Sequence, residues 1–278
     1  MGKTRRTMSM LAALAAAATA MLGARSAAAA SPPLLNSIAA IGDSISQAYD
    51  VCCSYGDHPA NSWTTGYSST DGVTSHYERV LAANSAISGH YFDDAVSGAK
   101  VADTATQASN AVTQAAQYVT VLIGANDVCT SSISTMTPTA TFQSQFQSTM
   151  STLESGLPAG AHIFVSSIPN IYNLWSVLHT NSSAEFVWSA AQICQSMLNR
   201  NNTETQRQQV LSQEEADNSV LQQVCQQYAN CLWDNLTTFN YQFAASQVST
   251  LDYFHPNLSG QAALASASWG ASWWPTTA

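Results

Sequence analysis

Short apolar runs alternate along the chain with longer stretches in which apolar residues recur at helical spacing. The apolar runs predict five strands, over residues 36–41, 91–96, 118–123, 163–167 and 231–234. The longer stretches predict helices near residues 72–83, 101–117, 139–153, 184–198, 204–228 and 259–269. Because strands alternate with helices, we expect an α/β fold with a mostly parallel five-stranded sheet.

The N-terminus has a pattern of its own. Lys3, Arg5 and Arg6 precede an apolar run over residues 10–22, and four alanines follow at 27–30. A basic start, a short apolar segment and small residues predict a secretory signal peptide over residues 1–30. The alternative is a buried alanine-rich helix, which the flanking charges disfavour. The pair Arg5-Arg6 leaves Sec and Tat export both open. Residues 31–278 are then expected to form a single extracellular domain without a membrane span.

The composition narrows the class of protein. Hydrophobic residues make up 46% of the 278 residues, which is enough for a sizeable core and excludes disorder, collagen and coiled coils. Four of the eight Lys and Arg residues lie in the first thirty positions, so the remainder carries four bases against 17 acids. Such a surface repels phosphate backbones, and we expect no nucleic-acid partner.

Six cysteines in an exported chain predict disulfides. A zinc site is the alternative, but no CxxC pair is present. Cys225 and Cys231 flank a short turn between a predicted helix and a predicted strand, so they are the first pair to expect. The other candidates are Cys52, Cys53, Cys129 and Cys194, whose connectivity the sequence leaves open.

Polar residues follow the predicted strands, where the active sites of parallel α/β sheets lie. Ser44 comes just after the first strand, and Gly42 leaves room for a sharp strand-to-helix turn that would present its hydroxyl. His255 is the candidate base, and Pro256 keeps it out of a helix. Asp252, three residues earlier, is the candidate carboxylate that orients the imidazole.

The same strand ends also offer donors for an oxyanion. The backbone N–H groups of Ser44 and Gly98 and the side-chain amide of Asn126 are the candidates. Together with the base and the carboxylate, they form the set that ester hydrolysis by a serine requires. Taken alone, Ser44 would be read as a helix N-cap. Asp43, Asp127 and the other histidines, His76 among them, are expected to be structural or on the surface.

Four short blocks in order resemble those of the GDSL or SGNH hydrolase family. Residues 42–46 (Gly-Asp-Ser-Ile-Ser) resemble its first block, and Gly98 matches the glycine of its second. Residues 124–127 (Gly-Ala-Asn-Asp) are similar to its Gly-x-Asn-Asp element, and residues 252–255 (Asp-Tyr-Phe-His) match its Asp-x-x-His. The resemblance spans residues 41 to about 269.

This resemblance implies a flavodoxin-like three-layer α/β/α sandwich and a serine ester hydrolase that forms an acyl-enzyme on Ser44. It implies no metal and no organic cofactor, a small-molecule or lipid ester as substrate, and a monomer. A carbohydrate O-acetylesterase or a phospholipase of the same fold is the alternative within hydrolases. A secreted domain that binds without catalysis is the alternative outside them.

Two finer features resemble the secreted, actinobacterial and phospholipase-B-like branch of the family. They are residues 61–66 (Asn-Ser-Trp-Thr-Thr-Gly) and the cysteine at position 129, after Asn126-Asp127-Val128. The branch implies three disulfides, with a cysteine before a proline in the first loop. Here His58 precedes Pro59 and Cys53 is extra, so Cys52 pairs with its neighbour, with a distant cysteine or with nothing.

Overall fold

Five parallel strands form one sheet in the order β2-β1-β3-β4-β5. This computed structural model describes residues 1–2 and 31–276, so the predicted signal peptide lies outside the described residues except for its first two. The strands are β1 (Ile38–Gly42), β2 (Tyr91–Asp93), β3 (Tyr118–Leu122), β4 (His162–Val165) and β5 (Cys231–Trp233). The prediction of an α/β fold with a five-stranded sheet is confirmed, and every pairing in the sheet is parallel.

Helices connect the strands. They are α1 (His76–Ala83), α2 (Thr104–Thr113), α3 (Ala125–Val128), α4 (Thr139–Gly156), α5 (Ile171–Leu178), α6 (Ser182–Ala190), α7 (Gln195–Leu198), α8 (Glu204–Cys225), α9 (Thr237–Asn240) and α10 (Leu258–Gly270). Short 3-10 turns, η1 to η5, occupy Pro59–Asn61, Ser85–Ile87, Val101–Asp103, Ile133–Thr135 and Ala245–Gln247. In the part of the chain that the structure describes, no helix is long and apolar enough to cross a membrane.

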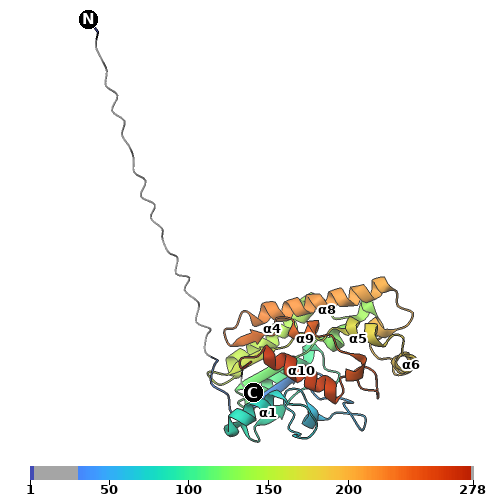
Figure 1. Cartoon of the computed structure of the whole chain (residues 1–278), viewed down its shortest axis with the longest axis horizontal. Coiled ribbons are helices and arrows are strands. Elements are labelled where there is room, and N and C mark those ends of the chain that lie inside the picture. The colour runs from blue at the N-terminus through green and yellow to red at the C-terminus, as the bar shows by residue number, and fades with distance from the viewer. Residues whose placement is uncertain (3–30, 277–278) are drawn as a thin grey trace. The chain divides into compact units, whose positions relative to one another are not determined.

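Alternate residues of each strand point to opposite faces of the sheet, and both faces are buried against helices. Val119 and Val121 of β3 belong to one core cluster, with side chains from α2, α4 and α8. Tyr118 and Leu122 of the same strand belong to a second cluster, with side chains from α1 and α10. Figure 1 shows α4 and α8 on one side of the sheet and α1 and α10 on the other. The three-layer α/β/α arrangement is therefore confirmed.

The strand order decides where a site can form. β1 pairs with β2 on one side and with β3 on the other, so the connections from these central strands diverge at the carboxyl end of β1. A crevice opens at such a topological switch point. Ser44 follows β1 and Asn126 follows β3, which places both at this edge.

Several element boundaries differ from the sequence prediction, and the reasons for three of these differences are clear. The first helix begins only at His76, because Ser75 and Glu78 form a capping box there. β2 ends at Asp93, three residues early, because the chain then leaves the sheet toward Gly98. The helix expected over residues 184–198 is two helices, since Gln192 and Cys194 adopt positive φ between α6 and α7.

Helix α5 was not predicted from the sequence. Its eight residues, Ile-Tyr-Asn-Leu-Trp-Ser-Val-Leu, make little more than two turns, which is shorter than the stretch over which a helical period can be recognised. Asn170 caps the helix by accepting a hydrogen bond from the backbone N–H of Asn173 at 2.8 Å. The tertiary position of α5, beside the active-site edge, makes it part of a cavity described below.

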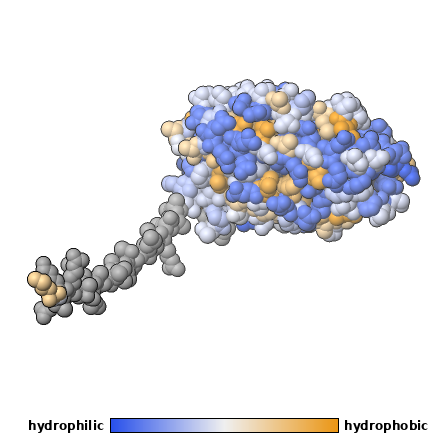
Figure 2. Space-filling model, turned by 90° about the horizontal axis from the view of Figure 1, so that it is seen from above, coloured by the Kyte–Doolittle hydropathy of each residue, from blue (hydrophilic) through white to orange (hydrophobic). Residues whose placement is uncertain are grey.

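Polar side chains cover most of the surface, as the low charge content requires. Figure 2 shows hydrophilic residues over much of one face, with small hydrophobic patches between them. The exposed large hydrophobic side chains beyond residue 30 include Tyr55, Tyr67, Val96 and Phe186. Isolated apolar residues of this kind are normal on a protein surface.

Candidate active site

Ser44 stands two residues beyond the end of β1, at 7% exposure. Gly42 has to be a glycine, because a Cβ there would lie 2.4 Å from the carbonyl oxygen of Leu122. The expected helix does not follow. Residues 44–50 form hydrogen-bonded turns instead, since Ala48 and Asp50 adopt positive φ and end any helical run. The strand-to-helix prediction was therefore wrong here, while the sharp turn itself is present.

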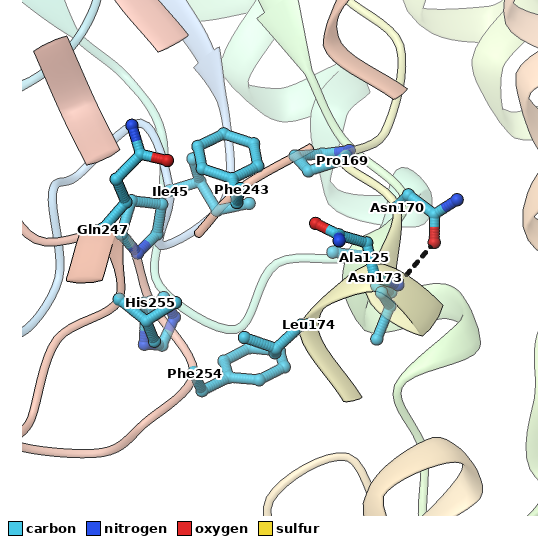
Figure 3. A pocket seen from close by; sticks show the side chains of 13 residues that line it. Ile45, Ala125, Pro169, Asn170, Asn173, Leu174, Phe243, Gln247, Phe254 and His255 are labelled. Atoms are coloured by element: carbon cyan, nitrogen blue, oxygen red, sulfur yellow. Dashed lines mark hydrogen bonds between the residues drawn. The ribbon is translucent and has the colours of Figure 1, made fainter. Parts of the chain in front are cut away.

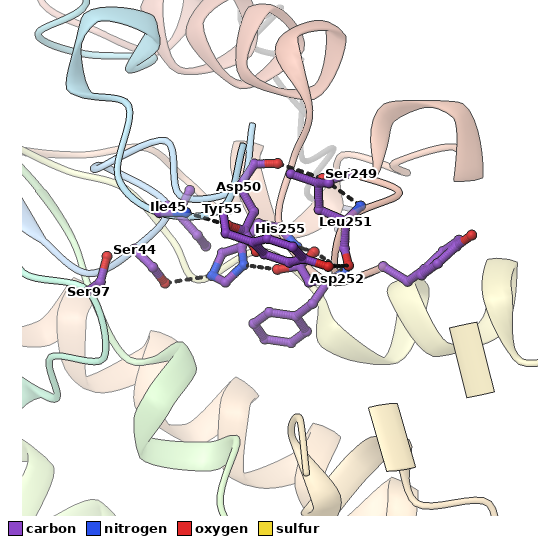
Figure 4. Close-up of polar contacts among 12 residues, drawn as sticks. Ser44, Ile45, Asp50, Tyr55, Ser97, Ser249, Leu251, Asp252 and His255 are labelled. Carbon is purple, nitrogen blue, oxygen red and sulfur yellow. Dashed lines mark hydrogen bonds and ion pairs between the residues drawn. The ribbon is translucent and has the colours of Figure 1, made fainter. Parts of the chain in front are cut away.

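His255 and Asp252 lie on the loop before α10, 211 and 208 positions away from Ser44 in the sequence. The His255 Nε2 and the Ser44 Oγ are 2.7 Å apart. On the other side of the ring, Nδ1 contacts Oδ2 of Asp252. Figure 4 shows the three side chains in one continuous line of polar contacts. The structure thus brings together all three residues that the sequence singled out.

The loop is shaped to hold this arrangement. Oδ1 of Asp252 accepts hydrogen bonds from the backbone N–H groups of Phe254 at 2.8 Å and His255 at 3.1 Å. Tyr253 adopts a positive φ, which turns the chain sharply between the carboxylate and the imidazole. The His255 ring also packs against the rings of Tyr49 and Phe254, so packing and hydrogen bonds fix the same orientation.

The three proposed oxyanion donors open onto one cleft. This cleft has a volume of about 690 Å³ and is lined by Ser44, Gly98, Asn126 and His255 among others. Gly98 adopts a φ of +83°, which favours glycine. Within the described residues, no group accepts a hydrogen bond from the backbone N–H of Ser44 or Gly98. Both donors therefore remain available to a bound oxygen.

Asn126 is positioned by its own side chain. Its Nδ2 donates to the carbonyl oxygen of Ala99 at 3.0 Å, next to Gly98. An amide nitrogen carries two hydrogens, so one ties the two loops together and the second is left for the cleft. The structure therefore brings the residues after β1, β2 and β3 to the same point.

Asp43 and Asp127 serve the backbone rather than the cleft. Oδ1 of Asp43 accepts from the N–H of Ile45 at 2.9 Å, and burial raises the pKa of this carboxyl to about 6. Oδ2 of Asp127 accepts from the N–H of Val101 at 2.9 Å, and burial raises its pKa as well. Both contacts fix turns that carry site residues.

The segment over residues 61–66 packs against the turn that carries Ser44 and supports it. The Ser62 hydroxyl donates to the carbonyl oxygen of Ser46 at 2.6 Å. Trp63 is fully buried, and its backbone N–H donates to Oε1 of Gln261 at 2.9 Å. Nε2 of Gln261 donates in turn to the carbonyl oxygen of Ile45 at 2.9 Å. This motif is therefore a structural support, which its sequence resemblance alone did not reveal.

A second, smaller cavity lies beside His255 and was not predicted. It has a volume of about 60 Å³, and apolar side chains make up most of its wall. Figure 3 shows Ile45, Leu174, Phe243 and Phe254 around it, with His255 at its edge. These residues come from the turn that carries Ser44, from α5 and from the loops on either side of η5, so no local pattern could have grouped them.

Two disulfides are present. Cys225 and Cys231 are joined, as their spacing suggested, and Cys129 is joined to Cys194. Cys52 and Cys53 are unpaired, so the three bridges that the branch resemblance implied are not found. Among the described residues, no group of three or more His, Cys, Asp or Glu side chains is arranged to hold a metal ion.

Solved structures of the same fold cover most of this chain at low identity. LAE5, an alpha/beta hydrolase enzyme from the metagenome of Lake Arreo, Spain, is 17% identical over 85% of this chain and 94% of its own, with a TM-score of 0.52. A GDSL-like lipase candidate from Parabacteroides merdae ATCC 43184 is 14% identical over 86% of this chain and 98% of its own, with a TM-score of 0.54. At such identities the likeness shows the fold alone.

The family follows from the sequence itself. No curated protein matches the chain. The model of the GDSL-like lipase/acylhydrolase family matches residues 38–268, a range that contains Ser44, Gly98, Asn126, Asp252 and His255. The chain therefore belongs to the GDSL-like lipase/acylhydrolase family and is a carboxylic ester hydrolase.

Proposed function

We propose that the enzyme cleaves its ester through an acyl-enzyme on Ser44. His255 Nε2 takes the hydroxyl proton while Oγ attacks the carbonyl carbon. The resulting oxyanion accepts hydrogen bonds from Ser44 N–H, Gly98 N–H and the Asn126 amide. As the tetrahedral intermediate collapses, His255 returns the proton to the leaving alcohol oxygen. Water then attacks the acyl-enzyme with His255 again as the base, which releases the acid and restores Ser44.

Asp252 has a different task in this proposal. It accepts the hydrogen bond from Nδ1, so that Nε2 of the neutral ring faces Ser44 with its lone pair. Its charge also stabilises the imidazolium that forms during each proton transfer. Two backbone N–H groups hold the same carboxylate in place, which supports a fixed orientation.

The contact that carries the proposal is the 2.7 Å approach of His255 Nε2 to Ser44 Oγ. A Ser44→Ala variant should lose turnover of p-nitrophenyl acetate by a factor on the order of 10⁵–10⁶ and should no longer react with a fluorophosphonate. Ser97→Ala is the matched control, because Ser97 lines the same cleft and its hydroxyl donates to Asp57. If Ser44→Ala still turns over and Ser97→Ala does not, the nucleophile is assigned wrongly.

We propose further that the small apolar cavity receives the acyl group. It shares His255 and Phe254 with the cleft, so it lies within reach of a carbonyl held at Ser44. A water molecule needs roughly 10–15 Å³ of such volume. A cavity of about 60 Å³ therefore fits an acyl group of a few carbons. The preferred substrates are then short-chain esters, and the wide cleft accommodates the alcohol.

A series of p-nitrophenyl esters from acetate to palmitate tests this assignment. We expect kcat/KM to be highest for acetate to butyrate and to fall with longer chains. Leu174→Ala enlarges the cavity and should shift the optimum to longer chains. Phe186→Ala, an exposed apolar residue of α6 outside both cavities, is the control and should leave the profile unchanged. A palmitate optimum in the unaltered enzyme would contradict the short-acyl proposal.

The cavities also favour one alternative among the substrates. A short acyl site beside a wide cleft that contains Asp50, Ser97 and Gln192 suits an acetylated carbohydrate better than a phospholipid with long chains. Acetate release from acetylated xylan, compared with fatty-acid release from phosphatidylcholine, separates the two. Binding of either without release would favour a non-catalytic domain.

We propose that the enzyme is exported and that residues 31–278 form the mature domain. Two disulfides favour an oxidising compartment, and the compact unit begins at Ser31. Sequencing the N-terminus of protein recovered from culture medium would test cleavage after Ala30, and light scattering would test the expected monomer. We infer membership of the secreted, phospholipase-B-like branch from residues 61–66 and Cys129 alone.

A further inference from the structure

Gln107 holds the backbone from which the nucleophile projects. It lies one turn into α2 and is 3% exposed. Its Oε1 accepts from the N–H of Gly42 at 2.8 Å, and its Nε2 donates to the carbonyl oxygen of Gly42 at 2.9 Å. A single side chain thus pairs with both backbone groups of the last residue of β1, two positions before Ser44.

This side chain takes the place of a strand. β2 pairs with β1 only as far as Ala40, and then the chain turns away toward Gly98. The N–H of Val96 still donates to the carbonyl oxygen of Gly42 at 3.1 Å. The N–H of Gly42, however, has no strand left to accept from it on this side. A buried backbone N–H is rarely left unpaired, and the Gln107 amide supplies the acceptor.

The pair of hydrogen bonds between Gln107 and Gly42 also joins two parts of the candidate site. α2 follows directly on the Gly98 loop, through η3, so Gln107 and Gly98 belong to one continuous segment. Asn126 donates to Ala99 in the same segment, which ties the loop after β3 to it. The hydrogen bonds between Gln107 and Gly42 therefore link the backbone that carries Ser44 to the segment that carries the Gly98 donor and contacts Asn126.

We infer that Gln107 is a positioning residue for ester hydrolysis, which aligns Ser44 with the Gly98 and Asn126 donors. The inference rests on the mechanism proposed above. It gives Gln107 no contact with substrate, so its loss should lower the rate of the chemical steps and leave substrate binding nearly unchanged. Misplacement of reacting groups by about 1 Å can lower a rate roughly 100-fold.

Gln107→Leu tests the inference against Gln114→Leu. Gln114 follows the same helix, and its Nε2 donates to Asp94 at 2.9 Å without touching β1. We expect Gln107→Leu to lower kcat for p-nitrophenyl acetate by about 10- to 100-fold, with KM within about twofold. Gln114→Leu should keep kcat near the wild-type value. Equal losses of kcat in the two variants, measured on protein shown to be folded by circular dichroism, would overturn the inference.

A Gln107→Glu variant adds a readout that general destabilisation does not move. A protonated carboxyl has the shape of the amide, donates to the Gly42 carbonyl and accepts from its N–H. An ionised carboxylate has no hydrogen to donate and faces that carbonyl with a negative charge. At pH 5.5 we expect kcat of the Glu variant to lie well above that of the Leu variant, as a fraction of wild type. Burial raises the pKa of a carboxyl at this position, so lowering the pH from 8 to 5.5 should raise kcat of the Glu variant as a fraction of wild type. A fraction that does not rise over this range would overturn the inference, and this comparison holds even if the Leu variant fails to fold.

A double variant locates the effect. If Gln107 acts by aligning the oxyanion donors, Gln107→Leu should lower kcat by a smaller factor in an Asn126→Ala background than in the wild type. If the double variant lowers kcat by the product of the two single-variant factors, the two residues act independently, and the proposed alignment is contradicted. Failure of the proposed function is distinguishable, because it would appear as turnover retained in Ser44→Ala, whatever the Gln107 variants do.

Discussion

Two histidines of this protein are bonded on both ring nitrogens, yet their surroundings differ completely. His255 stands at the carboxyl edge of the sheet between an aspartate and a serine, and its side chain is 11% exposed. His76, the first residue of α1, is fully buried in the core. Its Nδ1 lies 3.0 Å from the Tyr118 hydroxyl and its Nε2 lies 2.9 Å from the Ser268 hydroxyl. His255 has a carboxylate partner and faces a cleft, and these surroundings suit its ring for proton transfer. Neutral partners hold the other ring still.

The bonds around His76 also set its tautomer. The Ser268 hydroxyl donates to the carbonyl oxygen of Leu264 at 2.6 Å, so it accepts from His76 Nε2–H. Nδ1 then accepts from the Tyr118 hydroxyl. Trp63 and Trp269 pack edge-on against the ring, and burial lowers the pKa of His76 to about 3. The comparison teaches that partners and solvent access, rather than the residue type, separate chemistry from structure.

Exchanging the two histidines for inert residues should give opposite results. We expect His255→Ala to lower kcat/KM by a factor on the order of 10⁵ while the melting temperature changes little, because the loop keeps its backbone bonds. His76→Phe should lower the melting temperature, since it strands the Ser268 and Tyr118 hydroxyls, and should keep kcat within a few-fold. Kinetics and thermal melts of both variants decide this. A His76 variant that melts normally but is inactive would break the comparison.

Removing the carboxylate should matter less than removing the ring. In the proposed mechanism, Asp252 orients His255 and stabilises its charged form without moving a proton itself. We therefore expect Asp252→Ala to lower kcat by about 10⁴-fold, and to retain more activity than His255→Ala. Parallel kcat measurements on folded samples check the order. The reverse order would mean that the two roles are assigned wrongly.

Removing one proposed oxyanion donor should lower kcat by a smaller factor than removing the Asp252 carboxylate. Asn126→Ala removes one of three proposed donors, so kcat should fall by roughly 10²–10³-fold with little change in KM. Asn230→Ala is a matched control, because Nδ2 of Asn230 also donates to a backbone carbonyl, that of Ala161 at 3.3 Å, and Asn230 lies outside both cavities. A loss confined to KM in Asn126→Ala would show that this amide binds substrate instead.

The smallest effect concerns stability at acid pH. The folded pKa of His76 lies below the value of about 6.5 in an unfolded chain, so the unfolded state takes up the proton first. Stability from this group is complete above pH 6.5 and is lost as the pH falls toward 3. At pH 5 the loss should be about 2 kcal/mol. Buried Asp43 and Asp217 act with the opposite sign, because burial raises their pKa values to about 6 and about 7.

The effect of His76 is therefore measured as a difference. Urea denaturation of wild type and His76→Phe between pH 7.5 and pH 5 cancels the contribution of the carboxyls, which both proteins share. The stability advantage of the wild type should shrink by about 2 kcal/mol over that range. An advantage that stays constant would show that burial does not lower the pKa of His76 in the folded protein.

Sequence periodicity predicted the five strands closely, because strands buried on both faces must be apolar. The boundaries failed where neighbouring segments decided them. β2 ends early so that the chain can turn toward Gly98, and a disulfide to Cys129 accompanies the break before α7. Helix α5 was not predicted because its eight residues are too few to show a helical period. Such features depend on contacts between segments far apart in the chain.

The sequence by itself determined the alternation of strands and helices in an α/β fold. It also marked Ser44, Gly98, Asn126 and His255, because each follows a predicted strand or lies in a terminal loop and has chemistry that suits that place. Only the tertiary structure decided that His255 reaches Ser44 across 211 residues, that Gln107 replaces a missing strand, and that an apolar cavity lies beside the imidazole. It also left Cys52 and Cys53 unpaired. The physical reason is one of range. Backbone periodicity and turn chemistry are local, whereas cavities, clamps and pairings arise when parallel strands bring distant loops to the same edge.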